Sequence, residues 1–515
     1  MGRVKRFLWG TALLAGVNLL LRGVSVSFNA YVALKIGEES MGLFTLVMSV
    51  YGMAVTLATS GVNLAAVRLS AEKLAPLNEG GADKRTYKKC VAGVISRLFL
   101  YSLLFGVGTG ILLFNSAPFV GKILLGDVRT VLSLKVLSVS LPAISLTAAL
   151  SGYFTGVRKV YKNAASVVIE QGVKIALTSA ALCGTVPFFT DSVEYSCLAV
   201  VGGAAVAEGF SLVVNVLFYI FDSKRPQGER ASDGKVTFEK TKLSHVGEIA
   251  LPIAFGAYAR QGLSTAEHLF IPWGLRFSGL AADKALSAYG VLQGMVFPLL
   301  LLPSAVLSSA AGLLVPELAE MAALGKEGEI RRTVKKVYSV STVFSLGTAA
   351  VFLAFAEYLG IAVYDNHQAS VYLLVTAPLV SVMYFDMTAD AMLKGLGEQV
   401  HSMKINIADS ALSLFFALVL VPFLGIKGYI ISVYVCESMN CILSVHRLKK
   451  VTGILPSLKN SILPVLLAST VAVVLTSIMP RLLGTSGLES VRLILCALIV
   501  VSVSAFIGAF AKKDC

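Results

Sequence analysis

Charge is scarce in this chain. Only 14% of its 515 residues are charged, against roughly 25% in a soluble domain. Hydrophobic residues make up 56%, and the mean hydropathy is +0.79. Such a composition excludes an ordinary water-soluble domain and is typical of a membrane protein.

The residues of metal and thiol chemistry are few and dispersed. Seven cysteines and five histidines lie scattered along the chain. Their spacing predicts neither a disulfide framework nor a metal site. No Gly-x-x-x-x-Gly-Lys-[Ser/Thr] motif occurs, so the sequence does not indicate ATP hydrolysis. Because no nucleophile–base arrangement stands out either, we expect neither an enzyme nor a bound cofactor.

Long apolar runs are plentiful. A helix needs about 20 apolar residues to cross the hydrocarbon core of a bilayer. Such runs predict an all-α polytopic membrane protein with fourteen spans. The first run is too long for a signal peptide and leads directly into further spans. The predicted spans are 6–36, 40–72, 90–117, 131–156, 161–185, 195–221, 246–276, 285–316, 334–359, 369–394, 401–423, 426–446, 459–480 and 489–511.

The basic residues alternate from one loop to the next. Counted together with basic residues at the ends of the adjoining spans, the segments before the first predicted span and after each even-numbered span hold 30 lysines and arginines, whereas the alternate segments hold 8. The positive-inside rule therefore places both termini in the cytoplasm. The net charge of +14 reflects this topology and attraction to membrane lipids. Nucleic-acid binding is not expected, because no contiguous basic domain is present.

The chain repeats itself weakly. Arg22 lies 14 residues before Ile36, and Arg260 lies 15 before Leu275. A second correspondence relates Pro142 to Pro378 and Gly156 to Gly395. A carboxylate follows each of these glycines 14 residues later, as Glu170 or Asp409. We therefore predict two parallel six-helix lobes, a plan known in transporters. The predicted parts are a first lobe at 1–222, a cytoplasmic linker at 223–244, a second lobe at 245–448 and two added spans at 449–515.

Two arginines lie deep inside predicted spans. A guanidinium near the bilayer centre costs about 2.5–3.5 kcal/mol even on the lenient insertion scale, so it usually faces a hydrated or protein-lined interior. Arg22 and Arg260 are thus candidate ligands for phosphate or carboxylate in a central cavity. A structural cation satisfied by carbonyls is the alternative. Arg68, near the end of its span, would line the inner mouth of such a cavity or extend its charge to the membrane surface.

Several acids also fall within spans. Glu170 and Lys174 are spaced for a neutralised pair on one helix or for a polar patch lining a cavity. Asp386 and Asp390 lie one turn apart, where two carboxylates could bind a cation, share a proton or simply face the cytoplasmic vestibule. Coupling to Na⁺, H⁺ or the membrane potential is therefore open. Further acids that could partner an arginine are Glu208, Glu267, Asp409 and Glu437.

Several stretches resemble a known family. Phe7–Thr11, 36–44, 56–62, His268–Leu275 and Tyr289–Met295 are similar to the stage V sporulation protein B family, over essentially the whole chain. That family resembles the lipid II flippases of the MurJ type, within the superfamily of MATE-like exporters and polysaccharide flippases (the MOP superfamily).

The resemblance implies a fold and an activity. It implies a MATE-like transporter in the bacterial cytoplasmic membrane that flips undecaprenyl-pyrophosphate-linked sugars by alternating access. Cavity arginines of that family are thought to bind the pyrophosphate, a role that falls to Arg22, Arg260 and Arg68 here. This chain departs from the pattern in having few other cavity cations in its first half. We expect a monomer that contacts membrane lipids and cell-wall synthesis proteins.

Other functions stay open at this point. A cation-coupled drug exporter would favour acids in the first lobe, yet span one holds Arg22 and no acid. A membrane glycosyltransferase would also use arginines on pyrophosphate, but such enzymes usually carry a larger outer loop. A non-transporting scaffold for envelope assembly is the third alternative.

Overall fold

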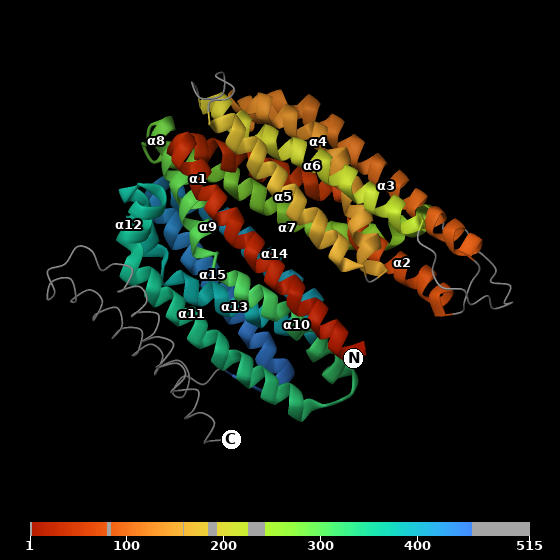
Figure 1. Cartoon of the computed structure of the whole chain (residues 1–515). Helices are drawn as coiled ribbons and strands as arrows, with labels where there is room; N and C mark the ends of the chain where they lie inside the picture. The colour runs from red at the N-terminus through yellow and green to blue at the C-terminus, as the bar shows by residue number, and fades with distance from the viewer. Residues whose placement is uncertain (1–2, 80–83, 158, 184–192, 225–242, 456–515) are drawn as a thin grey trace. The chain divides into compact units, whose positions relative to one another are not determined.

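The computed structural model describes residues 3–79, 84–157, 159–183, 193–224 and 243–455 (Figure 1). These residues are helical almost throughout, which confirms the all-α prediction. Among them, nine helices are long and apolar enough to cross a membrane, or ten if one bent pair counts as a span. The predicted linker core at 225–242 and the predicted spans 459–480 and 489–511 lie outside the described residues, so the count of fourteen stays a prediction.

Where the connecting residues are described, the helices follow one another with short turns. Those of the first half are α1 (Arg3–Thr59), α2 (Val62–Glu79), α3 (Lys84–Phe119), the π-helical η1 (Val120–Leu124), α4 (Thr130–Gly156), α5 (Val160–Leu182) and α6 (Val193–Lys224). Those of the second half are α7 (Leu243–Phe277), α8 (Ala282–Tyr289), the π-helical η3 (Gly290–Val296), α9 (Phe297–Leu300), α10 (Ser304–Ala323), α11 (Glu327–Tyr364), α12 (His367–Thr376), α13 (Leu379–Gly395), α14 (Gln399–Leu424) and α15 (Ile426–Thr452).

Three predicted spans are not regular helices. Span 40–72 is interrupted at Ser60 and Gly61, which both have positive φ. Span 285–316 is built of α8, η3, α9 and α10, with a turn at Leu301–Pro303. Span 369–394 is bent by 55° between α12 and α13. A proline stands at or beside the last two breaks, where its missing N–H and its ring favour a turn over a continuous helix.

Contacts divide the chain into two compact units. Unit 1 comprises 1–34 and 270–515, and unit 2 comprises 35–269. The divisions fall within α1, near its non-helical Gly37 (φ 78°), and within α7. The lobes predicted at 1–222 and 245–448 stay a prediction, since this grouping by contacts follows other boundaries.

Unit 2 is held together by close helix contacts. In it α3 packs on α4, which also contacts α2 and α6 (Figure 1). A Cβ added to Gly152 of α4 would lie 2.4 Å from the carbonyl oxygen of Asn63. Small residues allow such approach where apolar burial cannot drive helices together. The buried core combines α2, α3, α4 and α7, with Leu69, Leu98 and Ala250 fully or almost fully buried.

Unit 1 is organised around α13. This helix contacts α10, α11 and α15, and Leu318, Tyr338, Met392 and Leu448 form a buried core between them. The first part of α1 belongs to this unit through Asn29, which donates from Nδ2 to the carbonyl oxygen of Gly294 in η3 at 2.7 Å. The hydroxyl of Tyr364 donates to Met295 at 2.8 Å. These side chains satisfy carbonyls near the irregular segment, as an apolar environment requires.

Gly61 is a position where both the backbone conformation and a close neighbour disfavour a side chain. Its φ is +72°, and a Cβ there would lie 2.5 Å from the carbonyl oxygen of Ala250. We expect Gly61→Ala to lower the free energy of unfolding by about 1–3 kcal/mol, through strain and overpacking. Thermal unfolding in detergent measures it. The control is Gly93→Ala, whose Cβ would contact nothing within 4 Å. Equal midpoints for the two variants would contradict the prediction.

Candidate functional site

Arg22 lies within unit 1, on the long apolar helix α1. Its side chain is half-buried, and its charge acts on Tyr384 of α13, whose hydroxyl donates to the carbonyl oxygen of Leu300. The guanidinium therefore lies near the break between α9 and α10. Within the described part of the chain, Arg22 is not among the arginines that form an ion pair. Its charge is thus available to an anion.

Arg260 lies within unit 2, on an exposed face of α7. It too is outside the ion pairs found among the described residues. Neighbouring side chains join α7 to α1 and to the turn that follows it. The hydroxyl of Thr265 donates to the carbonyl of Ser49 in α1 at 3.1 Å, and that of Tyr258 donates to Ser60 in the turn at 2.6 Å. Because Arg22 and Arg260 belong to different units, the predicted chamber that they share stays a prediction.

Arg68 has a partner on its own helix. Its Nε lies 2.7 Å from Glu72 Oε1, and both side chains are exposed. Such an i,i+4 pair explains the charge at the end of a span. The predicted role of Arg68 at a cavity mouth is therefore untested, and substrate would have to compete with Glu72.

Asp386 and Asp390 lie one turn apart on α13, as their spacing predicts. Asp386 is buried, interacts with Ser444 of α15 through a side-chain hydrogen bond, and lies near enough to Asp390, Asp409 and Lys394 for their charges to act on it. Asp390 pairs with Lys394 at 2.6 Å and accepts a hydrogen bond from Ser402 of α14. Among the described atoms, Oδ1 of Asp386 has no hydrogen-bond partner. Two helices, α13 and α14, thus bring three carboxylates and one lysine together, and α15 adds the hydroxyl of Ser444.

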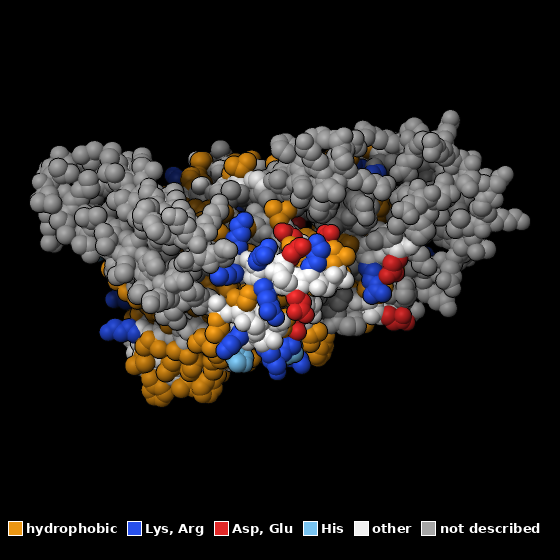
Figure 2. Space-filling view, turned by 90° about the horizontal axis from the view of Figure 1, so that it is seen from below, with side chains coloured by type: hydrophobic (Ala, Val, Ile, Leu, Met, Phe, Trp, Pro, Cys, Tyr) orange, Lys and Arg blue, Asp and Glu red, His pale blue; other side chains and the backbone are white. Residues whose placement is uncertain are grey.

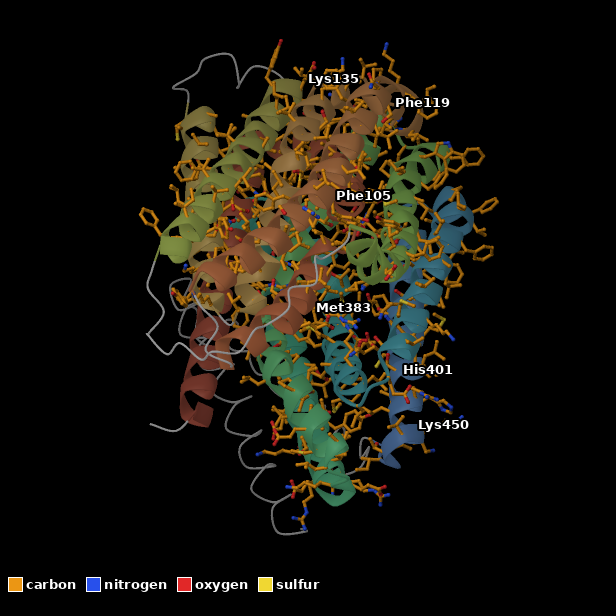
Figure 3. The ribbon with its side chains drawn as sticks, turned by 90° about the vertical axis from the view of Figure 1, so that its right-hand side faces the viewer. Phe105, Phe119, Lys135, Met383, His401 and Lys450 are labelled. Atoms are coloured by element: carbon orange, nitrogen blue, oxygen red, sulfur yellow. The ribbon has the colours of Figure 1, made fainter. Side chains whose placement is uncertain are left out.

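A second ionic group lies where α14 begins and α15 ends. Arg447 reaches Glu398 with Nη2 at 2.8 Å and Nε at 3.1 Å, and His401 Nδ1 lies 3.1 Å from the same carboxylate. Figure 3 shows His401 and Lys450 close to this end of the two helices. Sequence reasoning missed this group, because its members lie 49 residues apart and only the antiparallel packing of α14 and α15 joins them.

Glu170 and Lys174 lie on one face of α5, both half-buried. Their charges act on each other and on Glu208 of α6, which is also half-buried. The sequence predicted that Glu170 and Lys174 form either a neutralised pair or a polar patch. The structure adds the carboxylate of Glu208 to these two residues. The remaining predicted acids, Glu267 on α7 and Glu437 on α15, are both half-buried.

The turn between η1 and α4 carries an ionic cluster outside the candidate spans. Arg129 Nη2 lies 2.7 Å from Asp127 Oδ2, and Nη1 lies 2.7 Å from Glu39 Oε1. Hydrogen bonds to Asp127 raise the pKa of the Arg129 guanidinium most, burial opposes this, and Glu39 adds to it. Glu39 follows the kink at Gly37, so the cluster joins this part of α1 to the α4 turn within unit 2.

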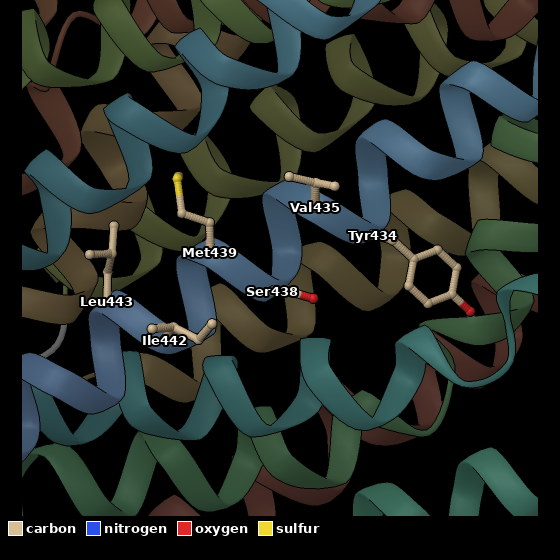
Figure 4. A pocket seen from close by; sticks show the side chains of 6 residues that line it. All are labelled: Tyr434, Val435, Ser438, Met439, Ile442 and Leu443. Carbon is tan, nitrogen blue, oxygen red and sulfur yellow. The ribbon is translucent and has the colours of Figure 1, made fainter. Parts of the chain in front are cut away.

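An open groove runs along α15. About 460 Å³ in volume, it is lined by Tyr434, Val435, Ser438, Met439, Ile442 and Leu443 (Figure 4). The lining is apolar apart from two hydroxyls, of which that of Tyr434 donates to the carbonyl of Val375. Such a groove suits hydrocarbon chains. By contrast, Figure 2 shows a face on which lysine and arginine side chains gather among a few acids, beside hydrophobic surface.

Comparison with known proteins agrees with this description. The family "Polysaccharide biosynthesis protein" matches residues 7–244. Stage V sporulation protein B of Bacillus subtilis (strain 168) is 27% identical over 430 residues, covering 82% of this chain and 79% of the relative. Sporulation protein YkvU of the same organism is 21% identical over 401 residues, covering 76% and 83%.

Solved structures show the same fold. The lipid II flippase MurJ, in an inward closed conformation, matches with a TM-score of 0.68 at 13% identity, covering 99% of each chain. An inward-facing multidrug resistance MATE transporter of the MOP superfamily matches with a TM-score of 0.62 at 16% identity, covering 85% of this chain and 98% of the transporter. The resemblance predicted from the sequence is thereby confirmed. The chain is an integral membrane protein with the fold of these transporters.

The Arg129 cluster should contribute measurable stability. We expect a double-mutant cycle with Arg129→Gln and Glu39→Gln to give a coupling energy of about 0.5–1 kcal/mol, because the pair is partly exposed. The measurement is reversible unfolding of the four proteins in mixed micelles. The exposed pair Arg331–Glu327 is the control and should give less. Additive effects at Arg129 and Glu39 would show that they do not interact.

Proposed function

We propose that this protein is a flippase that moves undecaprenyl-pyrophosphate-linked oligosaccharide, such as a lipid II-like precursor, across the bacterial cytoplasmic membrane by alternating access. The membrane fold and the similarity to transporters support the general part of this proposal, that the protein is a membrane transporter. The direction would be from the cytoplasmic to the outer leaflet, with both termini in the cytoplasm, as the distribution of lysine and arginine favours.

The observation that carries the proposal is the state of Arg22. A half-buried guanidinium within an apolar helix, outside the ion pairs among the described residues, is costly unless an anion or water meets it. Pyrophosphate is such an anion, and the planar fork of arginine can bind two of its oxygens at once. Arg22 would therefore bind the headgroup while the prenyl tail stays in hydrocarbon.

Arg260 would supply the second guanidinium. It is exposed and likewise outside the ion pairs described, so a phosphate oxygen could approach it without displacing a carboxylate. Arg68 would act at entry instead, exchanging Glu72 for a phosphate oxygen. Exchange costs less at an exposed pair, since such pairs contribute only about 0–1 kcal/mol.

Coupling would use the acids of unit 1. Asp386 presents a buried carboxylate oxygen without a partner among the described atoms, near Asp390 and Asp409. Lys394 balances one of these three negative charges. A monovalent cation, Na⁺ or H⁺, would balance more of the charge and so link ion binding to the arrangement of α13, α14 and α15.

A second candidate is a cation-coupled exporter of cationic drugs, which the MATE likeness and the Asp386 cluster favour. A cationic substrate would meet repulsion at Arg22, and span one carries no acid to offset it. The lipid-linked substrate therefore remains the better fit. Efflux of a fluorescent cation from proteoliposomes, without transfer of the lipid-linked sugar, would favour the exporter.

Removing either arginine should slow transport. In proteoliposomes with a fluorescent lipid-linked disaccharide, we expect Arg22→Ala and Arg260→Ala to reduce the leaflet-transfer rate by about tenfold or more. A charge-assisted hydrogen bond contributes about 1.5–3 kcal/mol, and 1.4 kcal/mol is a factor of ten. Arg22→Lys should retain part of the rate.

The control for this experiment is Arg331→Ala, which removes an exposed arginine at the start of α11. Its transfer rate should match that of the wild type. Normal transfer by correctly folded Arg22→Ala and Arg260→Ala would reject the arginine mechanism, whereas absence of transfer by every protein would reject the substrate.

Asp386 should determine the response to an ion gradient. We expect Asp386→Asn to abolish the acceleration that an imposed Na⁺ or H⁺ gradient gives, with the rate without a gradient changed by less than about threefold, because the amide keeps the shape and loses the charge. Testing each ion separately identifies the coupling cation. Glu329→Gln, on the exposed start of α11, is the matched control. Retained acceleration in Asp386→Asn would remove this residue from the coupling site.

A further inference from the structure

A polar seam runs between α5 and α6 in unit 2, apart from the residues assigned above to the substrate and to ion coupling in unit 1. Polar side chains recur on α5 at every fourth residue, which places them on one face of the helix. They are Lys162, Ser166, Glu170, Lys174 and Thr178. On α6 the facing side chains are Glu208, Ser211 and Asn215, and the two helices pack along their length.

Hydrogen bonds join the two faces step by step. Lys162 Nζ donates to the carbonyl oxygen of Phe218 at 3.2 Å, and Asn215 Nδ2 donates to Ser166 Oγ at 2.5 Å. The hydroxyls of Ser166 and Ser211 lie 3.3 Å apart, and Ser211 also interacts through a hydrogen bond with Glu170. Ser166, Asn215, Ser211 and Glu170 are thus joined in one network, and Lys162 lies one turn before Ser166 on the same face of α5.

The charged residues in this seam do not balance. Glu170, Lys174 and Glu208 act on one another electrostatically, and all three are half-buried. When all three are ionised, the two carboxylates and one ammonium leave one negative charge. Within apolar helices a net charge is costly unless something neutralises it. The group of Glu170, Lys174 and Glu208 thus needs one positive charge more than its own side chains supply, since Lys162 lies two turns from Glu170 and donates to the carbonyl oxygen of Phe218 instead.

Two buried acceptors lie at the ends of the charged group. Thr178 Oγ1, one turn beyond Lys174, and Asn215 Oδ1, one turn beyond Ser211, have no hydrogen-bond partner among the described atoms. Their residues are 0% and 1% exposed. Asn215 already uses its amide nitrogen within the seam, so its oxygen lies in the same network. Buried acceptors of this kind call for a hydrogen donor.

The surrounding helices add one titratable neighbour. Tyr51 of α1 is acted on by Glu208 and Glu170 and shares a hydrogen bond of 2.6 Å with Ser140 of α4. The lysine of α4, Lys135, lies over the ring of Phe114 instead (Figure 3 labels it). The charged groups that act on the two carboxylates are therefore Lys174 and the carboxylates themselves, with Tyr51 as a neutral neighbour.

We propose that Glu170, Glu208 and Lys174 form a proton-binding site, in which one carboxylate oxygen takes up a proton from water and releases it again. A proton fits this site better than a metal ion. The ammonium group of Lys174 would repel a metal cation bound beside the two carboxylates, whereas a proton bound to one of them leaves a neutral carboxyl group. No covalent bond other than the O–H bond forms or breaks. The site is a property of unit 2 and does not depend on which substrate the protein carries.

Proton uptake by the purified full-length chain in nanodiscs tests this assignment. Acidification is followed by infrared absorption of the protonated carboxyl group and by a pH indicator in weak buffer. Glu208→Gln and Glu170→Gln each leave one carboxylate beside Lys174, a neutral pair, and should bind about one proton fewer than the wild type. Lys174→Gln leaves two carboxylates without a cation and should bind up to one proton more than the wild type over the same range.

The matched control is Glu194→Gln, which changes an acid in the first turn of the same α6 and should leave uptake through the seam unchanged. Uptake equal to that of the wild type in both Glu→Gln variants would overturn the proposal, as would Lys174→Gln binding fewer protons. Replacing choline by Na⁺ should have no effect, and suppression of uptake by Na⁺ would assign the site to a metal cation instead. Gel filtration of each variant identifies any that fail to fold. Lys174→Gln remains an independent test, because it should change proton uptake in the opposite direction.

Discussion

The constraint on which this structure depends is that polar groups within hydrocarbon must find partners inside the protein. Long helices satisfy their own backbones, so the apolar sequence needs little else for most of its length. Where a helix is irregular, side chains supply the missing bonds, as Asn29 and Tyr364 do around η3. Where a charge lies within a span, it is paired, bound to a network, or available to a ligand. We assign the proposed function to the last of these.

The charged residues therefore separate into two kinds. Arg68 with Glu72, Arg447 with Glu398, and Arg129 with Asp127 are neutralised by neighbours and need no ligand. Arg22, Arg260, the Asp386 group and the Glu170–Lys174–Glu208 group are not balanced in this way among the described residues. A transporter of an anionic lipid needs cations for its cargo and acids for its driving ion, and the second kind contains both.

Much of this could be predicted from the sequence. Apolar runs predicted α3, α4, α5 and α6 within a few residues, since burial in hydrocarbon leaves a helix few alternatives. The boundary predicted between spans 6–36 and 40–72 falls at the non-helical Gly37 of α1. Breaks at Gly61 and within 285–316 were missed, because they depend on tertiary contacts such as the approach of Ala250 and the bonds to η3. The partnership of Glu398 with Arg447 was missed for the same reason, whereas Asp386 and Asp390 share a helix and were found by spacing alone.

The π-helical segment η3 has a consequence for how this sequence can vary. A π-helical turn contains one residue more than an α-helical turn, so η3 amounts to a single insertion in its span. Deleting one residue there would restore a regular α-helix and rotate everything on one side of it by about 100°. Asn29 and Tyr364 would then lose the carbonyls that they bind. Natural variants that shorten this segment should therefore also replace these two polar side chains by apolar ones.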